Sequence, residues 1–152
     1  MNNINIFKTQ IRLHDTDAAG LLFFARQFNI IHDAYEQLLE KMGLSFAVLL
    51  KQRDYFLPIV HAESDFKAPL FAGDRIEVHV SLDNIGNTSF TLRYALINAA
   101  KTIVGTAKTV HVTISQDTGK KIDLPMELRQ ALEQFAKSTR KTKSSPKKSK
   151  RR

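Results

Sequence analysis

Residues 14–44 read "HDTDAAGLLFFARQFNIIHDAYEQLLEKMGL", an acidic segment followed by a regular apolar pattern. The apolar side chains recur at steps of three and four residues, as they do on one face of an α-helix. They are Phe24, Phe28, Ile31, Tyr35, Leu38, Leu39 and Met42. Gly43 follows at the position where helices commonly end in a left-handed residue. The stretch therefore predicts one long helix with a single apolar face, entered from an acidic loop.

Strand patterns surround this helix. Residues 5–13 alternate well enough for a first strand, and the mixed residues 44–54 predict a short helical turn. Later strands are expected at 55–69, with Pro58 near the start or at a sheet edge, and at 74–85, 88–98 and 102–115. A final helix has Pro125 in its first turn and packs on the margin of the sheet. We expect an α+β fold: a first strand, the helix, then four strands in antiparallel succession, with the sheet wrapped around the helix.

Length and composition limit the class of protein. The chain has 152 residues and 43% hydrophobic residues, which suits one core. The absence of cysteine excludes disulfides, thiolate catalysis and cysteine-rich zinc sites. The chain has no apolar run of about eighteen residues, and its start lacks the layout of a secretory signal. The sequence therefore predicts a cytoplasmic protein.

The net charge of +8 is concentrated at one end of the chain. Residues 137–152, "KSTRKTKSSPKKSKRR", hold nine of the 23 basic residues and no acid, so the first 136 residues, with 14 basic and 15 acidic side chains, carry a net charge of −1. A segment without apolar residues cannot offset its ordering entropy. We expect one domain, residues 1–136, and a disordered basic tail. The tail either contacts polyanions or only solubilises the chain.

Asp15 and Asp17 lie in the loop that leads into the predicted helix. The first amide groups of a helix lack intrahelical partners and form its positive end, so they can stabilise an oxyanion. Ala18, Ala19 and Gly20 allow close approach of substrate, and a nearby carboxylate can act as nucleophile or general base. The loop therefore predicts an acyl-transfer site. A simpler interpretation, that either aspartate only caps the loop or the helix, stays open at this point.

The loop and helix resemble the signature of the hotdog-fold acyl-CoA thioesterases of the 4-hydroxybenzoyl-CoA thioesterase type. That motif reads acid-x-Asp-small-small-Gly, followed by a short apolar run and the central helix. The similarity continues through "LPIVHAESDFKAPLFAGDRIEVHV" to "NTSFTLRYALIN" and covers roughly residues 5–135. The resemblance implies a hotdog fold, hydrolysis of an acyl-CoA without a cofactor, and homodimers that pair their sheets edge to edge and often stack into tetramers.

Within this family, "HDTDAAG" and "PIVHAE" are most similar to the branch that hydrolyses 1,4-dihydroxy-2-naphthoyl-CoA in menaquinone and phylloquinone synthesis. A second branch, linked to cell-envelope operons, takes general or short-chain acyl-CoA. A third possibility is a hotdog module that binds acyl-CoA without turnover. The retained acid at position 17 favours an enzyme.

The resemblance also implies roles for single residues. Asp17 matches the catalytic carboxylate, the backbone N–H of Phe24 matches the group that polarises the thioester carbonyl, and Gly20 matches the motif glycine. Phe23 is a candidate for binding the acyl group. His61 lies on the strand that, in the family, reaches the active site of the partner subunit. As a lone histidine it is more often an ordinary sheet residue.

Two departures from the family pattern stand out. Phe24 replaces an aromatic hydroxyl that some members carry, which keeps the backbone donor and removes a side-chain donor. The segment "NIGNTSF" has none of the basic residues with which some members hold the phosphates of coenzyme A.

The remaining histidines predict no metal site. His32 and Glu36 are spaced as an ordinary i,i+4 pair on the helix. His79 and His111 fall at positions expected to be polar or exposed on strands, and no His/Asp spacing matches a metal motif.

Overall fold

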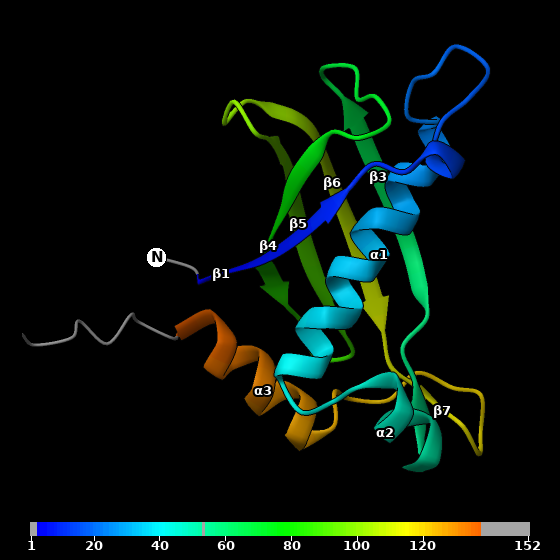
Figure 1. Cartoon of the computed structure of the whole chain (residues 1–152). Helices are drawn as coiled ribbons and strands as arrows, with labels where there is room; N and C mark the ends of the chain where they lie inside the picture. The colour runs from blue at the N-terminus through cyan, green and yellow to red at the C-terminus, as the bar shows by residue number, and fades with distance from the viewer. Residues whose placement is uncertain (1–2, 53, 138–152) are drawn as a thin grey trace, which may run out of the picture.

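The computed structural model describes residues 3–52 and 54–137, and Figure 1 shows a curved antiparallel sheet with one long helix lying across it. The helix is α1, Phe24–Lys41. The sheet strands are β1 (Ile4–Gln10), β3 (Ile59–Phe66), β4 (Arg75–Ile85), β5 (Ser89–Asn98) and β6 (Ile103–Val112). Their order in the sheet is β1-β4-β5-β6-β3, with every pair antiparallel. This is the predicted α+β hotdog fold.

The order of strands differs from the simple succession that the sequence predicts. Strands β4, β5 and β6 follow one another as neighbours, but β3 pairs with β6 at the far edge, and β1 closes the other edge against β4. The predicted strand 55–69 is also divided. Tyr55–Phe56 forms β2, which pairs with β7 (Ile114–Ser115), and β3 begins only after Pro58. Proline lacks the N–H that a continuous ladder requires, so the break falls there.

Three short elements complete the described chain: the 3-10 turn η1 (Leu13–Asp15), α2 (Phe46–Gln52) and α3 (Met126–Lys137). The predicted helical turn and final helix are thus confirmed. Leu128 and Leu132 of α3 are fully buried, and the Arg129 guanidinium donates to the carbonyl of Gly86 at 2.6 Å. The helix therefore packs beside the turn between β4 and β5.

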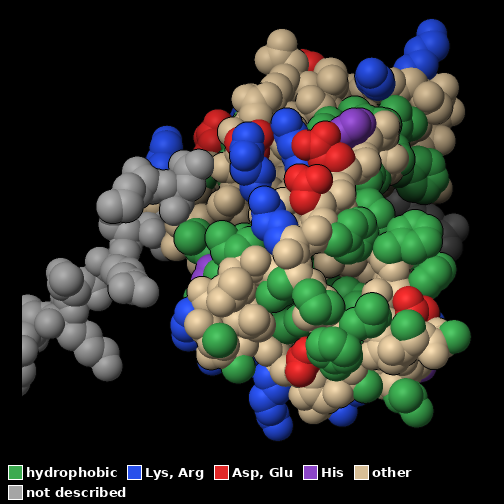
Figure 2. Space-filling model, turned by 90° about the horizontal axis from the view of Figure 1, so that it is seen from above, with side chains coloured by type: hydrophobic (Ala, Val, Ile, Leu, Met, Phe, Trp, Pro, Cys, Tyr) green, Lys and Arg blue, Asp and Glu red, His purple; other side chains and the backbone are tan. Residues whose placement is uncertain are grey.

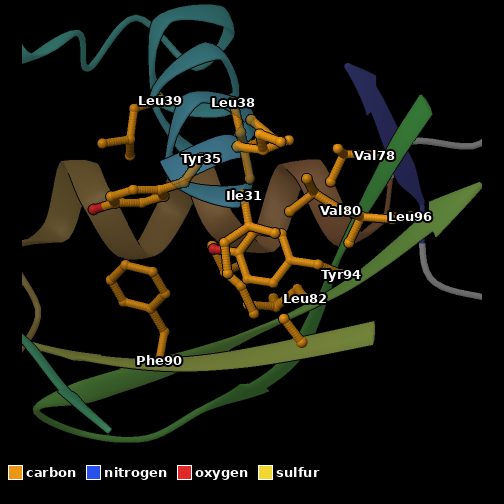
Figure 3. Packing of buried hydrophobic residues seen from close by; sticks show 14 of the residues in the cluster. Ile31, Tyr35, Leu38, Leu39, Val78, Val80, Leu82, Phe90, Tyr94 and Leu96 are labelled. Carbon is orange, nitrogen blue, oxygen red and sulfur yellow. The ribbon is translucent and has the colours of Figure 1, made fainter. Parts of the chain in front are cut away.

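The core lies between α1 and the sheet. Figure 3 shows Tyr35 facing Phe90 and Ile31 facing Tyr94. Phe24 does not belong to this buried face, because its side chain is 61% exposed. In the first turn Gln27, rather than Phe24, is buried against the sheet, so the predicted stripe is buried only from the second turn onward.

His111 corrects a second expectation, because it is fully buried rather than exposed. It pairs with Phe90 across the β5–β6 ladder, and both rings face the core, stacked at 4.7 Å. Its Nε2 is hydrogen-bonded to Thr109 Oγ1 at 2.8 Å. Burial lowers the pKa of His111 to about 3, because the charged imidazolium would lose its hydration.

The predicted basic tail lies outside the described residues from 138 onward, so its disorder and the domain boundary stay predictions. Within the described part of the chain, no helix is long and apolar enough to cross a membrane.

Candidate active site

The acidic loop is a closed structure between η1 and α1. Asp15 is buried, and its Oδ2 accepts the backbone N–H of Arg12 at 2.8 Å. Its carbonyl accepts the N–H of Phe23 at 2.8 Å, and Thr16 forms a bridge with Leu22. These contacts hold the end of the loop against its beginning. Asp15 therefore positions the loop at the start of the helix.

Asp17 lies exposed at the turn of this loop. Its Oδ1 accepts the N–H groups of Ala19 at 2.8 Å and Leu21 at 3.2 Å. Gly20, with φ of 78°, supplies the left-handed residue that this tight turn requires. Oδ2 makes no hydrogen bond with the described residues. Asp17 thus caps the turn with one oxygen and presents the other to solvent, so the capping and chemical interpretations are compatible.

The start of α1 is open beside this loop. Phe23 is the N-cap residue, and no side chain caps the helix. The first amide groups, beginning with Phe24, therefore have no intrahelical partner and lie at the positive end of an 18-residue helix. The rings of Phe23 and Phe24 are both exposed and meet edge to face at 4.9 Å. An anionic oxygen would be stabilised here, next to two aromatic rings.

Gln27 fixes the first turn of α1 to strand β3, a role that the sequence analysis missed. The side chain is 1% exposed, and its Nε2 donates to Ser64 Oγ at 2.7 Å and to the Asp65 carbonyl at 3.2 Å. Gly105 provides the space, since a Cβ there would lie 2.9 Å from Gln27 Nε2. Two signals were available: a polar residue within the apolar pattern of the helix, and a glycine inside a predicted strand.

Beyond Gln27, α1 and β3 separate and enclose a pocket of about 530 Å³. Phe28 and Ile31 line it from the helix, and Ile59 and Ala62 line it from the strand. Tyr94 and Thr109, whose hydroxyl oxygens lie 2.9 Å apart, also line this space. The pocket therefore combines apolar walls with a pair of hydroxyl groups.

Charged residues of α1 also line this pocket. His32 and Glu36 approach to 3.3 Å, which confirms the predicted i,i+4 pair. Partial burial and, next, the negative charge of Glu36 raise the pKa of Asp33 above its ordinary value.

His61 lies apart from the other predicted site residues within this protomer. Ala62 pairs with Thr109, and both face the pocket, so the neighbouring His61 and Glu63 point to the outer face of the sheet. There His61 Nε2 approaches Glu63 Oε2 at 3.0 Å. The acidic loop instead leads into α1, which lies on the inner face (Figure 1). The structure thus groups Asp17, Gly20, Phe23 and Phe24, and leaves His61 separate.

No group of three or more His, Asp or Glu side chains is arranged to hold a metal ion in residues 3–52 and 54–137.

A sheet wrapped around one helix, with an exposed carboxylate in the loop that leads into the uncapped start of that helix, is the arrangement of a hotdog protein of the thioesterase class. The chain belongs to the Thioesterase-like superfamily, whose family model matches residues 11–132.

Two relatives and one solved structure are similar to the chain over most of its length. The chain is 37% identical over 138 residues to a 1,4-dihydroxy-2-naphthoyl-CoA hydrolase of Rippkaea orientalis, covering 90% of this chain and 97% of the relative. It is 39% identical over 123 residues to the hydrolase of the same name from Microcystis aeruginosa, covering 81% and 88%. The crystal structure of a 1,4-dihydroxy-2-naphthoyl-CoA thioesterase from Synechocystis matches with a TM-score of 0.80 and 32% identity, covering 85% of this chain and 95% of that one.

Proposed function

We propose that the chain is a thioester hydrolase that acts on 1,4-dihydroxy-2-naphthoyl-CoA. The observation that carries the proposal is the free Oδ2 of Asp17 in a loop that leads directly into the uncapped start of α1. The similarity to hydrolases of this name over most of the chain supports the choice of substrate.

In the proposed reaction, Asp17 Oδ2 either attacks the thioester carbonyl carbon or takes a proton from a water molecule that attacks it. The backbone N–H of Phe24 stabilises the oxyanion that forms, and the C–S bond then breaks, so that coenzyme A leaves as a thiolate that is protonated by water. In the nucleophilic route, water next hydrolyses the mixed anhydride on Asp17. After a single turnover in ¹⁸O-water, a labelled oxygen on Asp17 would establish the nucleophilic route, since only attack of water on the Asp17 carboxyl carbon of the anhydride places it there.

The pocket between α1 and β3 supports an aromatic acyl group. Its apolar walls, Phe28, Ile31, Ile59 and Ala62, suit a flat ring, and aromatic contacts contribute about 0.5–1.5 kcal/mol each beyond burial. The hydroxyls of Tyr94 and Thr109 can exchange hydrogen bonds with ring hydroxyls. A straight aliphatic chain would leave these hydroxyls without such partners.

We propose a homodimer formed through strand β3. No residue of this eight-residue edge strand is buried, and Val60 is 57% exposed. An exposed edge of this length is a template for pairing with another strand. Phe23, Phe24 and Phe71 are exposed around the acidic loop, and Val48 and Phe56 are exposed near the start of β3.

Antiparallel pairing of two β3 strands about a twofold axis would bring the exposed phenylalanines around the acidic loop of each protomer against the exposed residues near the start of β3 in its partner. The same pairing brings His61 from the far end of β3 toward the acidic loop of the other protomer. A substrate-binding role for His61 stays part of this proposal, as does any further stacking into tetramers.

The deciding experiment is a panel of naphthoyl, benzoyl, phenylacetyl, hexanoyl and palmitoyl CoA esters, with thiol release measured as kcat/KM. We expect the naphthoyl ester to exceed both aliphatic esters by about a decade or more. A decade's advantage for an aliphatic ester would favour the general acyl-CoA branch. Binding of the esters without thiol release would identify a non-catalytic module.

Two finer proposals come from the sequence alone. The basic tail contacts polyanions, so deleting residues 137–152 should abolish salt-sensitive binding to DNA or anionic vesicles and leave thioester cleavage unchanged. The protein acts in the cytoplasm, which localisation of the tagged full-length chain would test.

A further inference from the structure

A basic hollow of about 570 Å³ lies at one end of the sheet, where β1 ends, β4 begins and the turn between β5 and β6 meets them. Four cationic side chains line it: Lys8, Arg12, Arg75 and Lys101. Glu77 is the only acidic side chain in the lining. Figure 2 looks onto this end of the molecule and shows Lys and Arg side chains gathered near acidic ones, beside an area of hydrophobic side chains.

The positive charge of the hollow is largely unneutralised. Glu77 is already engaged, because its Oε2 lies 2.8 Å from His79 Nε2 and its Oε1 lies 3.5 Å from Lys101 Nζ. The hydrogen bond with His79 lowers the pKa of Glu77, so this carboxylate stays ionised. Lys8, Arg12 and Arg75 form no ion pair with any described residue. Such a group of like charges in a concave surface attracts anions.

The hollow and the acidic loop share one segment of chain. Ile11 is fixed to the segment before β4, where its N–H donates to the Asp74 carbonyl at 2.9 Å and its carbonyl accepts the Gly73 N–H at 2.7 Å. Arg12, the next residue, lines the hollow and also donates its backbone N–H to Asp15. Asp17 lies five positions after Arg12 along the chain, a span of at most about 18 Å. One extended ligand can therefore contact both sites.

We infer that this hollow binds the phosphate groups of coenzyme A while the thioester lies at Asp17. The inference rests on the proposed function, and it supplies the phosphate contacts that the segment 84–90 lacks for want of basic residues. Arginine guanidinium groups bind phosphate oxygens through two parallel hydrogen bonds, and lysine binds them as a point charge. Arg75 on β4 and Lys8 on β1 present both kinds of group from neighbouring rigid strands.

The test compares the full-length wild type with the double variant Lys8→Ala/Arg75→Ala. Calorimetry would measure binding of coenzyme A, of coenzyme A lacking its 3′-phosphate, and of pantetheine. We expect the double variant to bind coenzyme A at least about tenfold more weakly, with a smaller loss for the dephosphorylated form and none for pantetheine. The control is Lys51→Ala, because Lys51 is exposed on α2, outside the lining of the hollow. This control should bind coenzyme A as the wild type does.

Kinetics separate this inference from the proposed function. In the double variant, KM for an acyl-CoA should rise about tenfold while kcat and the hydrolysis of acyl-pantetheine stay unchanged. Normal turnover with an unchanged KM would overturn the hollow as the phosphate site and leave the thioesterase intact. Weakened coenzyme A binding in a chain that hydrolyses no ester would retain the hollow and reject the function. Inorganic phosphate competing as strongly as coenzyme A would also overturn the assignment.

Discussion

Helix α1 is held very differently on its two sides. Toward β1, the Asn5 side chain is buried, donates to Gln37 Oε1 at 3.2 Å and accepts from Lys41 Nζ at 2.8 Å. Also on this side, the backbone N–H of Asn3 donates to the carbonyl of Ala136 in α3. Toward β3, the helix is fixed near its first turn by Gln27, and a pocket of about 530 Å³ follows.

The difference separates stability from function. On the β1 side, Asn5 holds the helix through its hydrogen bonds with Gln37 and Lys41, so changes there should act on folding. The β3 side leaves a pocket, an unpaired edge and exposed phenylalanines, which a monomer does not benefit from exposing. Changes on the β3 side should therefore act on assembly and turnover before they act on folding.

The largest effect should come from Asp17→Asn. The amide can neither attack the thioester nor accept a proton, so we expect thioester cleavage to fall by about two to three decades. Folding should be retained, because the amide oxygen can still accept the N–H groups of Ala19 and Leu21. Steady-state thiol release and circular dichroism would measure the two properties.

Asp15→Asn is the matched control. Its amide oxygen can still accept the Arg12 N–H, so cleavage should stay near the wild-type rate. A folded Asp17→Asn variant with more than about a tenth of wild-type activity would reject Asp17, and attention would move to Asp15.

The next effect tests the two edges of the sheet directly. Val60→Lys places a charge on the exposed β3 edge, and Ile6→Lys does the same on β1, where Ile6 is 41% exposed. Lysine on an edge strand opposes pairing. We expect Val60→Lys to raise the dimer dissociation constant at least about 100-fold, measured by analytical ultracentrifugation. The Ile6→Lys variant should stay dimeric. Equal dimer dissociation constants for the two variants would show that the β3 and β1 edges do not differ in their role in assembly.

The sequence predicted the elements that depend on local periodicity. The helix, the β4–β5 hairpin and the acidic loop were correctly placed, because apolar spacing and turn residues decide them locally. The pairing of β3 with β6 was missed, since nothing near residue 60 specifies a partner some 50 residues away. The orientation of His111 was wrong for the same reason, because its face depends on the register with Phe90.

The candidate site shows the same limit. Asp17 and the start of α1 are contiguous in sequence and were found together. The Gln27 contact and the basic hollow each combine residues from separate strands and helices, so only the assembled fold brings them together.

A smaller effect is expected at Gly105 of β6, which leaves space for the Gln27 side chain of α1. In Gly105→Ala, the new methyl group would lie 2.9 Å from Gln27 Nε2 and 3.2 Å from the Asp65 carbonyl, so the side chain or the strand must shift. We expect the free energy of unfolding to fall by about 1–3 kcal/mol in urea titrations. The double variant Gly105→Ala/Gln27→Ala should lose less than the sum of the two single variants. Strict additivity would show that Gln27 does not occupy the space above Gly105.

The last effect appears only at acid pH and concerns Tyr94, Thr109 and His111, which form a chain of hydrogen bonds beside the β3-side pocket. The pKa of His111 is about 3 in the folded protein, against an ordinary value of 6.5, because burial opposes the charged form. The unfolded chain therefore binds the extra proton between these values. The stabilising contribution of neutral His111 is fully present above about pH 6.5 and is lost as pH falls toward 3, with a slope of at most about 1.4 kcal/mol per pH unit.

His111→Phe keeps a ring against Phe90 and removes the titrating group, so its unfolding free energy should fall less steeply than that of the wild type as pH decreases from 6.5. Urea unfolding at closely spaced pH values would give both curves. Parallel curves would mean that His111 does not titrate differently in the two states. A converging pair of curves would show that protonation of His111 contributes to the loss of stability in acid.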